Sequence, residues 1–187
     1  MKSPILFVLG IFLTCSLFAQ KTDLNKLYNQ RVFNVIDLET TYPGSDKKPQ
    51  ITLTKKDQTG AIIWSNTYGG SSYERAGDVI PTPDKGYLVV GSTSSYGKGN
   101  YNIFVVKTNE FGEQLWFKTF GDFYNEYGRE ITLTPNRTFL IEASKQICTG
   151  EKNNFSKCKY YRWQLELDQE GELLDEQVLE PIVGAIN

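Results

Sequence analysis

Gly86-Tyr87-Leu88-Val89-Val90-Gly91 lies at the centre of the stretch that decides the fold, Gly69 to Phe120. The segment from Ile51 to Gly69 aligns without a gap with the segment from Ile103 to Gly121, which gives a period of 52 residues. Repeats of this length are typical of propeller blades, solenoids and other arrays of similar units. We therefore expect the chain to be a row of such units.

Each unit divides into four short segments with the composition of β-strands, separated by turn residues. In the central unit the expected strands are Ala76 to Thr82, Tyr87 to Thr93, Tyr101 to Thr108 and Glu113 to Phe120. The turn Pro83-Asp84-Lys85-Gly86 joins the first two strands, and its glycine is expected to adopt a positive φ. Because short turns join neighbouring strands, each unit is expected to be an antiparallel meander.

The sequence predicts an all-β repeat domain over residues 20–187, with units at about 31–68, 69–120 and 121–180. In the first unit, Val32 to Leu38 can serve as the second strand, and no clear first strand precedes it. In the last unit, seven extra residues lengthen the connection between the second and third strands. About three units of four-stranded, propeller-type blades are too few for an ordinary closed ring, so we expect an incomplete or open propeller.

The third strands of the two outer units carry polar residues at alternate positions, and alternate positions face opposite sides of a sheet. These residues are Thr52 and Thr54 in the first unit, and Arg162, Gln164 and Glu166 in the last. Under the alignment the two sets lie on opposite faces, whereas the central strand, Ile103 to Val106, is apolar on both faces. We therefore expect a finite stack in which each end unit turns a polar face to water and the central unit is the most buried.

A recurring set of residues runs through the central unit, from a Gly-Gly pair to a Gly-x-x-x-Trp turn. Its members are Gly69, Gly70, Glu74, Ala76, Asp78, Val79, Thr82, Asp84, Gly86, Tyr87, Val89, Gly91, Thr93, Val106, Lys107, Gly112 and Trp116. The set resembles the repeats of secreted bacterial β-propeller proteins, and the resemblance extends from Ile51 to about Leu179. It implies propeller-type blades. Asn100 and Asn102 stand where that family often has acidic residues, so it implies no cation site there.

The first 19 residues have the features of a secretory signal peptide: a basic Lys2, an apolar run from Ile5 to Leu13, and Ala19 at the expected cleavage site. The apolar run is shorter than the roughly 20 residues that a transmembrane helix needs. Cys15 raises a lipoprotein alternative, but the residues before it match a lipobox poorly. The mature chain is therefore expected to be secreted, periplasmic or at the cell surface, with no membrane span.

Cys148 and Cys158 are the two cysteines that remain after processing, and they bracket a polar loop, Thr149 to Lys157. In an oxidising compartment such a pair predicts one disulfide. A metal site is disfavoured because the chain contains no histidine and two thiolates alone do not complete a zinc site.

The charge and composition of the mature chain exclude several classes of function. Its 168 residues contain 19 Lys and Arg against 22 Asp and Glu, a net charge of −3, with no basic patch for nucleic acid. The absence of histidine excludes Ser-His-Asp and Cys-His nucleophiles. Acidic pairs such as Glu74 with Asp78 and Glu126 with Glu130 could support glycoside hydrolysis. Their repeat-equivalent positions favour a structural role instead.

These observations favour a secreted or cell-surface binding or scaffold protein that is not an enzyme and uses no cofactor. The expected binding surface contains Tyr96, Tyr101 and Phe155, on two loops that occupy equivalent places in adjacent units and should lie on one side. Exposed aromatic side chains of this kind suit a protein or glycan partner. The alternatives are a secreted hydrolase or quinoprotein-like propeller fragment, which the repeated acids and the Gly-x-x-x-Trp spacing suggest, and a shortened member of a longer propeller family.

Overall fold

The computed structural model describes residues 34–45, 48–149 and 158–182, and these residues form eleven strands and no helix. The first sheet contains β1 (Val35–Thr41), β2 (Gln50–Lys56) and β3 (Ile62–Tyr68). The central sheet contains β4 (Glu74–Pro81), β5 (Tyr87–Thr93), β6 (Asn102–Thr108) and β7 (Gln114–Phe120). The last sheet contains β8 (Glu126–Leu133), β9 (Phe139–Cys148), β10 (Cys158–Leu167) and β11 (Leu173–Pro181). The predicted signal peptide lies outside the described residues.

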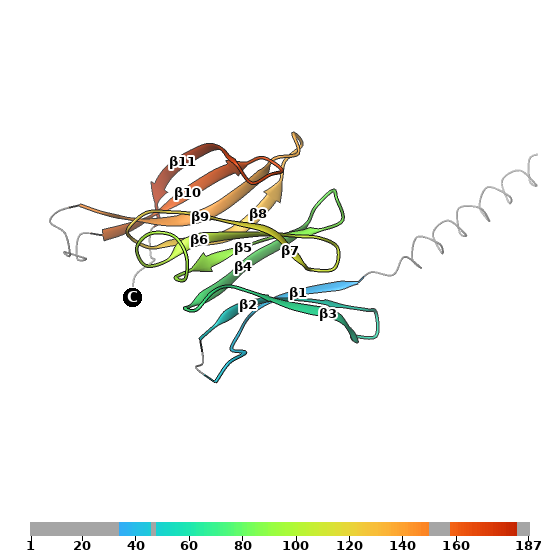
Figure 1. Cartoon of the computed structure of the whole chain (residues 1–187). Helices are drawn as coiled ribbons and strands as arrows, with labels where there is room; N and C mark the ends of the chain where they lie inside the picture. The colour runs from blue at the N-terminus through green and yellow to red at the C-terminus, as the bar shows by residue number, and fades with distance from the viewer. Residues whose placement is uncertain (1–33, 46–47, 150–157, 183–187) are drawn as a thin grey trace, which may run out of the picture.

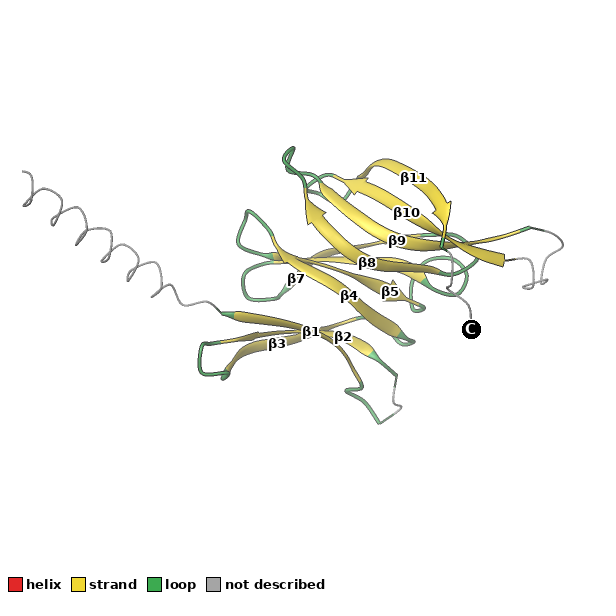
Figure 2. Ribbon diagram, turned by 180° about the vertical axis from the view of Figure 1, so that it is seen from behind, coloured by secondary structure: helices red, strands yellow, loops and turns green. Residues whose placement is uncertain are grey.

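The three sheets lie in layers, with the central sheet between the other two (Figures 1 and 2). Each strand pairs in antiparallel fashion with the strand that precedes or follows it in the chain. The predicted all-β class and the antiparallel meanders are confirmed, and the three sheets do not close into a ring.

The strand boundaries follow the predicted ones closely in the central sheet, where β5 spans the residues expected for it. The first sheet differs more, because β1 begins at Val35 and continues to Thr41. Leu38 pairs with Leu53 in this sheet, as Val90 pairs with Val105 in the central sheet, so β1 is the second strand of its unit. Among the described residues, the first sheet has no counterpart of β4 or β8.

One prediction about the turn between β4 and β5 was wrong. Lys85, not Gly86, has the positive φ, at 70°. Gly86 is needed for a different reason: a Cβ atom there would lie 2.0 Å from the carbonyl oxygen of Thr108. The glycine thus permits a close approach between two chain segments, and the lysine accepts the left-handed conformation.

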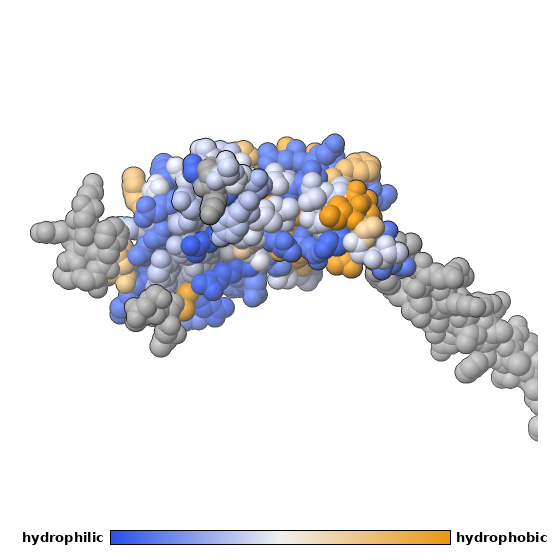
Figure 3. Space-filling view, turned by 90° about the horizontal axis from the view of Figure 1, so that it is seen from below, coloured by the Kyte–Doolittle hydropathy of each residue, from blue (hydrophilic) through white to orange (hydrophobic). Residues whose placement is uncertain are grey.

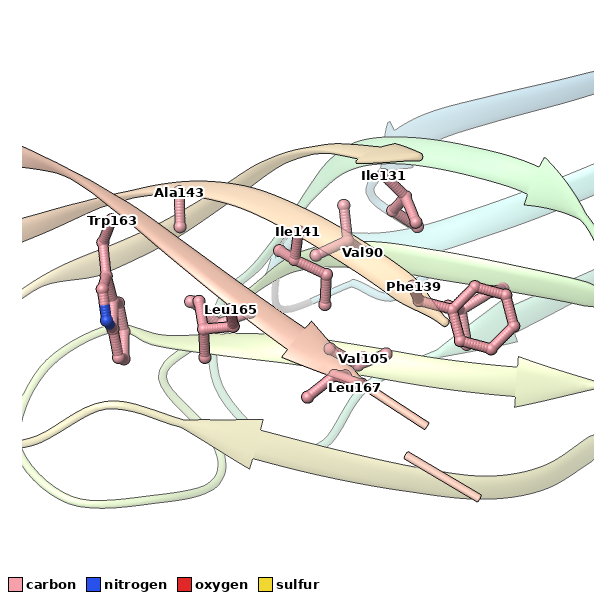
Figure 4. Packing of buried hydrophobic residues seen from close by; sticks show 11 residues of the cluster. Val90, Val105, Ile131, Phe139, Ile141, Ala143, Trp163, Leu165 and Leu167 are labelled. Atoms are coloured by element: carbon pink, nitrogen blue, oxygen red, sulfur yellow. The ribbon is translucent and has the colours of Figure 1, made fainter. Parts of the chain in front are cut away.

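Two apolar cores hold the layers together, one on each face of the central sheet. Between the first and central sheets the buried side chains are Ile51, Leu53, Tyr68, Tyr87, Val89, Phe104 and Val106. Between the central and last sheets they are Leu88, Val90, Ile103, Val105, Ile131, Phe139, Ile141, Ala143, Trp163, Leu165 and Leu167 (Figure 4). All four residues from Ile103 to Val106 are at most 1% exposed, so the central unit is the most buried, as predicted.

The outer faces of the two end sheets are polar, which confirms the expected pattern. On the first sheet, the hydroxyls of Thr41, Thr52 and Thr67 are linked in a row across the strands, and Lys56 pairs with Asp37. Seen from that side, the surface is mostly hydrophilic, with apolar residues gathered at one end (Figure 3). On the last sheet, the outward residues Arg162, Gln164 and Glu166 bond to Glu142, Glu180 and Thr138.

The sheets approach most closely at the edge formed by β4 and β8, the first strands of their units. A Cβ atom on Gly77 would lie 2.6 Å from the backbone oxygen of Gly128, so glycine is required where these two strands approach. The Asp78 carboxylate accepts a hydrogen bond from the Ile131 amide at 3.1 Å, and the Thr40 hydroxyl accepts one from the Ala76 amide at 3.0 Å.

A tryptophan of each of the first two units packs on a glycine turn of the next unit. A Cβ atom on Gly112 would lie 2.6 Å from the Trp64 ring, and one on Gly171 would lie 2.5 Å from the Trp116 ring. The Gly-x-x-x-Trp spacing therefore serves the contact between sheets. In the last unit, Asp175 stands at the equivalent position of the tryptophan.

The predicted disulfide is present: Cys148 and Cys158 form the last cross-strand pair of β9 and β10 and are joined by an S–S bond. Residues 150–157 lie outside the described residues. Replacing both cysteines with serine is expected to lower the free energy of unfolding by about 2 kcal/mol, because the closed loop is short. Mass spectrometry of the non-reduced mature chain and urea denaturation check this. Two thiols that react with an alkylating agent would contradict the pairing.

Candidate functional site at the loop end

The antiparallel topology divides the connections between strands into two groups at opposite ends of the sheets. We call one the turn end; it contains the five-residue turns 57–61, 82–86, 109–113, 134–138 and 168–172. We call the other the loop end; it contains the connections 42–49, 69–73, 94–101, 121–125 and 149–157. Figure 1 shows the loop end on the left, where the β9–β10 hairpin projects. The loops of Tyr96 and of the disulfide therefore start on one side of the stack, as predicted.

At the turn end, several polar side chains stabilise the turns by bonding within them, and others bond to neighbouring strands. Asp57 accepts hydrogen bonds from Thr59 and the Ala61 amide, and Asn109 and Asp168 repeat this arrangement in their turns. The Asp84 side chain is 56% exposed, but the desolvation of its carboxylate still opposes ionisation. Hydrogen bonds from Lys107 and Thr82 outweigh that effect and lower the pKa of Asp84 to about 2.

The repeated acids of the loop end lie between the sheets rather than in an open cleft. Glu74 is fully buried and accepts hydrogen bonds from the Thr93 hydroxyl at 2.8 Å and from the Gln50 amide at 2.7 Å. Because Gln50 belongs to the first sheet, this carboxylate joins two layers. The hydrogen bonds of Glu74 and Asp78 therefore agree with a structural role for these two acids.

Glu126 occupies the position of Glu74 in the last sheet, but its surroundings differ. It is fully buried, one carboxylate oxygen accepts a bond from the Asp122 amide, and the other has no partner among the described residues. Lys145 stands at the position equivalent to Thr93 and pairs with Asp122 at 3.1 Å. Burial raises the pKa of Glu126 to about 7, and the charge of Asp122 adds to this, while Lys145 opposes it.

This burial predicts a pH-dependent stability that Glu126→Gln removes. The folded protein holds the Glu126 proton more tightly than the unfolded chain, whose glutamate has a pKa of 4.5. The stability that this proton contributes is therefore present below pH 4.5 and is lost as the pH rises to about 7. In the wild type we expect the free energy of unfolding to fall by about 2 kcal/mol over this pH range, a figure that allows for partial solvent screening. In Glu126→Gln this pH-dependent contribution should be absent. Denaturation of both proteins at pH values from 4 to 8 measures this difference. Parallel profiles of the free energy of unfolding against pH would contradict the prediction.

Tyr96, one of the expected binding residues, faces inward. Its ring packs on Phe104, with centroids 5.8 Å apart, and on Phe117, at 4.8 Å. Its hydroxyl donates a hydrogen bond to the Gly69 carbonyl oxygen at 3.1 Å. Both the ring and the hydroxyl thus bind the loop to the sheets, which leaves little of Tyr96 for a partner.

Tyr101, the second expected residue, belongs to a row of aromatic rings that joins the central and last sheets. Its ring centroid lies 5.4 Å from that of Tyr127, which in turn lies 6.1 Å from that of Tyr160. The guanidinium of Arg75 sits over Tyr101 at 5.2 Å and over Tyr127 at 5.9 Å. The three rings are half-buried and Arg75 is exposed. We call these four residues the tyrosine row.

Sequence reasoning missed Arg75 and Tyr160 and placed Tyr127 only in a wider cluster of loop aromatics, although the repeat contains a signal for all three. Tyr160 is the repeat equivalent of Tyr101, and Tyr127 is the repeat equivalent of Arg75. The row is thus the same pair of positions taken from two neighbouring units. Phe155, the third expected binding residue, lies outside the described residues.

Two of the hollows that border the last sheet have volumes of about 370 Å³ and 280 Å³. The larger is lined by Arg129, Glu130, Glu142, Ala143, Arg162 and Ile182. The smaller opens between the central and last sheets, where the Trp163 ring is covered by Lys145, 4.3 Å from its centroid. In the larger hollow, Arg162 forms ion pairs with Glu142 and with the neighbouring Glu180. In the smaller, Lys145 forms an ion pair with the neighbouring Asp122.

Within the described ranges, no group of three or more His, Cys, Asp and Glu side chains is placed to hold a metal ion. In those same ranges, no helix is long and apolar enough to cross a membrane. A scan against protein-family models and a search of curated proteins found no match to this chain.

Proposed function

We propose that this protein is an exported, non-catalytic binding module that contacts its partner with the loop end. The observation that carries the proposal is the tyrosine row, an exposed arginine laid on the half-buried rings of two tyrosines at the junction of two sheets. Tyrosine and arginine are the residues that contribute most often to hot spots of protein interfaces. In this protein the central and last sheets hold the arginine and the tyrosines in place.

The composition of the surrounding loops supports the same proposal. The connections 69–73, 94–101 and 121–125 are rich in Gly, Ser, Asn and Tyr, a composition that suits adaptable contact surfaces. Phe123 and Tyr73 add exposed aromatic area, at 74% and 48% exposure. Loops held by a rigid scaffold are common carriers of binding function.

We also propose that the sheets are propeller-type blades of an open propeller and that a signal peptide exports the chain to the periplasm, the cell surface or the medium. The convergence of β4 and β8, the Gly–Trp contacts between layers and the repeat pattern support the first part. The disulfide supports the second, because such bonds persist in oxidising compartments. No observation favours the hydrolase alternative, since Glu74 and Glu126 are fully buried.

The proposal predicts that tyrosines of the row are needed for binding. Mature protein with Tyr101→Ala and Tyr127→Ala is expected to bind its partner at least tenfold more weakly, since each ring contributes a hot spot of about 1 kcal/mol or more. Phe111→Ala is the matched control, because Phe111 is a 61% exposed aromatic residue at the turn end. Pull-downs from the producing cell's envelope and a glycan array measure the binding.

Two results would contradict this function. Equal binding by the wild type and the double variant, with equal melting temperatures, would place the site elsewhere. Turnover of a polysaccharide or another substrate by the purified chain would show that it is an enzyme.

A further inference from the structure

The guanidinium of Arg75 has an unusual environment for an exposed cation. One face of the group lies against the rings of Tyr101 and Tyr127, so its position is fixed. It forms no ion pair with any carboxylate of the described residues. A guanidinium held in this way presents its N–H groups as a preorganised fork, the geometry that binds a carboxylate through two parallel hydrogen bonds.

The distribution of charge across the molecule points in the same direction. The five turns of the turn end contain seven carboxylates and only two cations, Lys85 and Arg137. In the described residues of the loops at the other end there are two lysines, Lys48 and Lys98, and one carboxylate, Asp122, which is paired with Lys145. The described residues of the loop end thus carry no unpaired negative charge in a chain that is acidic overall, which favours the approach of an anionic partner.

The packing of the row distinguishes a protein partner from a glycan. The ring planes of Tyr101 and Tyr127 are tilted by 38°, and those of Tyr127 and Tyr160 by 37°. Because each ring packs against the next and Arg75 covers two of them, the ring faces that a sugar would stack on are largely occupied. The exposed guanidinium and the half-buried rings together suit the polar and apolar groups of a polypeptide.

We infer that the tyrosine row receives an acidic segment of a protein partner, with an aspartate, glutamate or terminal carboxylate bound by Arg75. This inference rests on the proposed binding function of the loop end and names the chemistry of its partner. The carboxylate forms paired hydrogen bonds with the guanidinium, and apolar parts of the same segment pack against the exposed edges of Tyr101 and Tyr127. Tyr160 supports Tyr127 from behind as a positioning residue.

The test uses the mature, oxidised chain and a displayed library of random twelve-residue peptides as the probe. Peptides selected by the wild type are expected to be enriched in Asp and Glu, and their binding should weaken as NaCl is raised from 0.05 M to 0.5 M, because salt screens exposed charge pairs. Arg75→Gln is expected to reduce the affinity of the selected peptides tenfold or more, and Arg75→Lys severalfold, since lysine keeps the charge but loses the fork. Lys85→Asn, at the turn end, is the matched control and should bind like the wild type, because asparagine also accepts its positive φ.

Four outcomes would overturn the inference. Selected peptides without acidic enrichment, or equal binding by the wild type and Arg75→Gln, would remove the role of the guanidinium while leaving loop-end binding intact. Binding of uronate or sulfated oligosaccharides in place of peptides would assign the site to glycans. If no peptide and no glycan binds the wild type, the proposed binding function itself fails, and the envelope pull-down with the double tyrosine variant detects that failure separately.

Discussion

Val106→Asp is expected to lower the free energy of unfolding by about 4 kcal/mol, because it places an unpaired charge in an apolar core. Val106 is completely buried between the first and central sheets, among Leu53, Tyr87 and Phe104. The buried residues of that core carry no positive charge, and Lys55 already lies over the Tyr87 ring, 5.8 Å from its centroid, so the new carboxylate must either become protonated or separate the layers. Chemical denaturation monitored by tryptophan fluorescence measures the change, and a Val106→Ala variant separates the loss of volume from the effect of charge.

Thr54→Asp is the matched control, since Thr54 is the repeat equivalent of Val106 and lies on the outer face of the first sheet. Its hydroxyl is 2.9 Å from that of Ser65, and it stands opposite Asp37 in the strand register. The aspartate loses that bond and gains a like-charged neighbour, for an expected cost of about 1 kcal/mol or less. Similar losses for the two aspartate variants would mean that the first sheet has no solvent-facing side.

The glycine turns provide a second test with a large expected effect. Gly60, Gly112 and Gly171 all have positive φ, at 86°, 74° and 79°, so alanine at any of them carries a similar backbone cost of about 1 kcal/mol. At Gly112 and Gly171 the new methyl group also collides with a tryptophan of the preceding unit, whereas nothing lies within 4 Å of the same position on Gly60. We therefore expect losses of about 3 kcal/mol for Gly112→Ala and Gly171→Ala, because overpacking adds to the backbone cost, and about 1 kcal/mol for Gly60→Ala.

A double-mutant cycle isolates the contact between the layers. Combining Gly171→Ala with Trp116→Ala removes the collision, because the three atoms nearest the new methyl group all belong to the Trp116 ring, so the two losses should add to more than the loss of the double variant. Equal losses at all three glycines, or strict additivity in the cycle, would show that the turn conformation alone explains these residues.

The repeat made most of the fold predictable, because a strand pattern found once could be checked in a second copy. The alternation of Ile51, Leu53, Thr52 and Thr54 assigned both the buried and the solvent-facing side of the first sheet, and the structure has them so. The conformation of the turn at Lys85 was not predictable from residue preferences, since it depends on how closely Gly86 approaches Thr108.

The candidate site was harder to predict than the fold, because it is formed by residues of two units. Tyr101 could be chosen as an aromatic residue beside a loop, but its contact with Arg75 and Tyr127 depends on how the central and last sheets pack. Tyr96 is also a tyrosine in a loop, but its ring faces inward and packs on Phe104 and Phe117. The two tyrosines therefore differ in the side chains that they contact in the folded protein, and the type of a single residue does not predict those contacts.

The sheets form an open stack, and we propose that its polar outer faces leave the loop end as the contact surface. Light scattering of the mature, oxidised chain after gel filtration tests it most directly. We predict the mass of a single chain across the micromolar range, because the hydroxyl row of the first sheet and the ion pairs of the last sheet make most of the two outer faces polar. A stable two-chain particle that Thr54→Arg dissociates would contradict the claim, since the outer face of the first sheet would then be an interface.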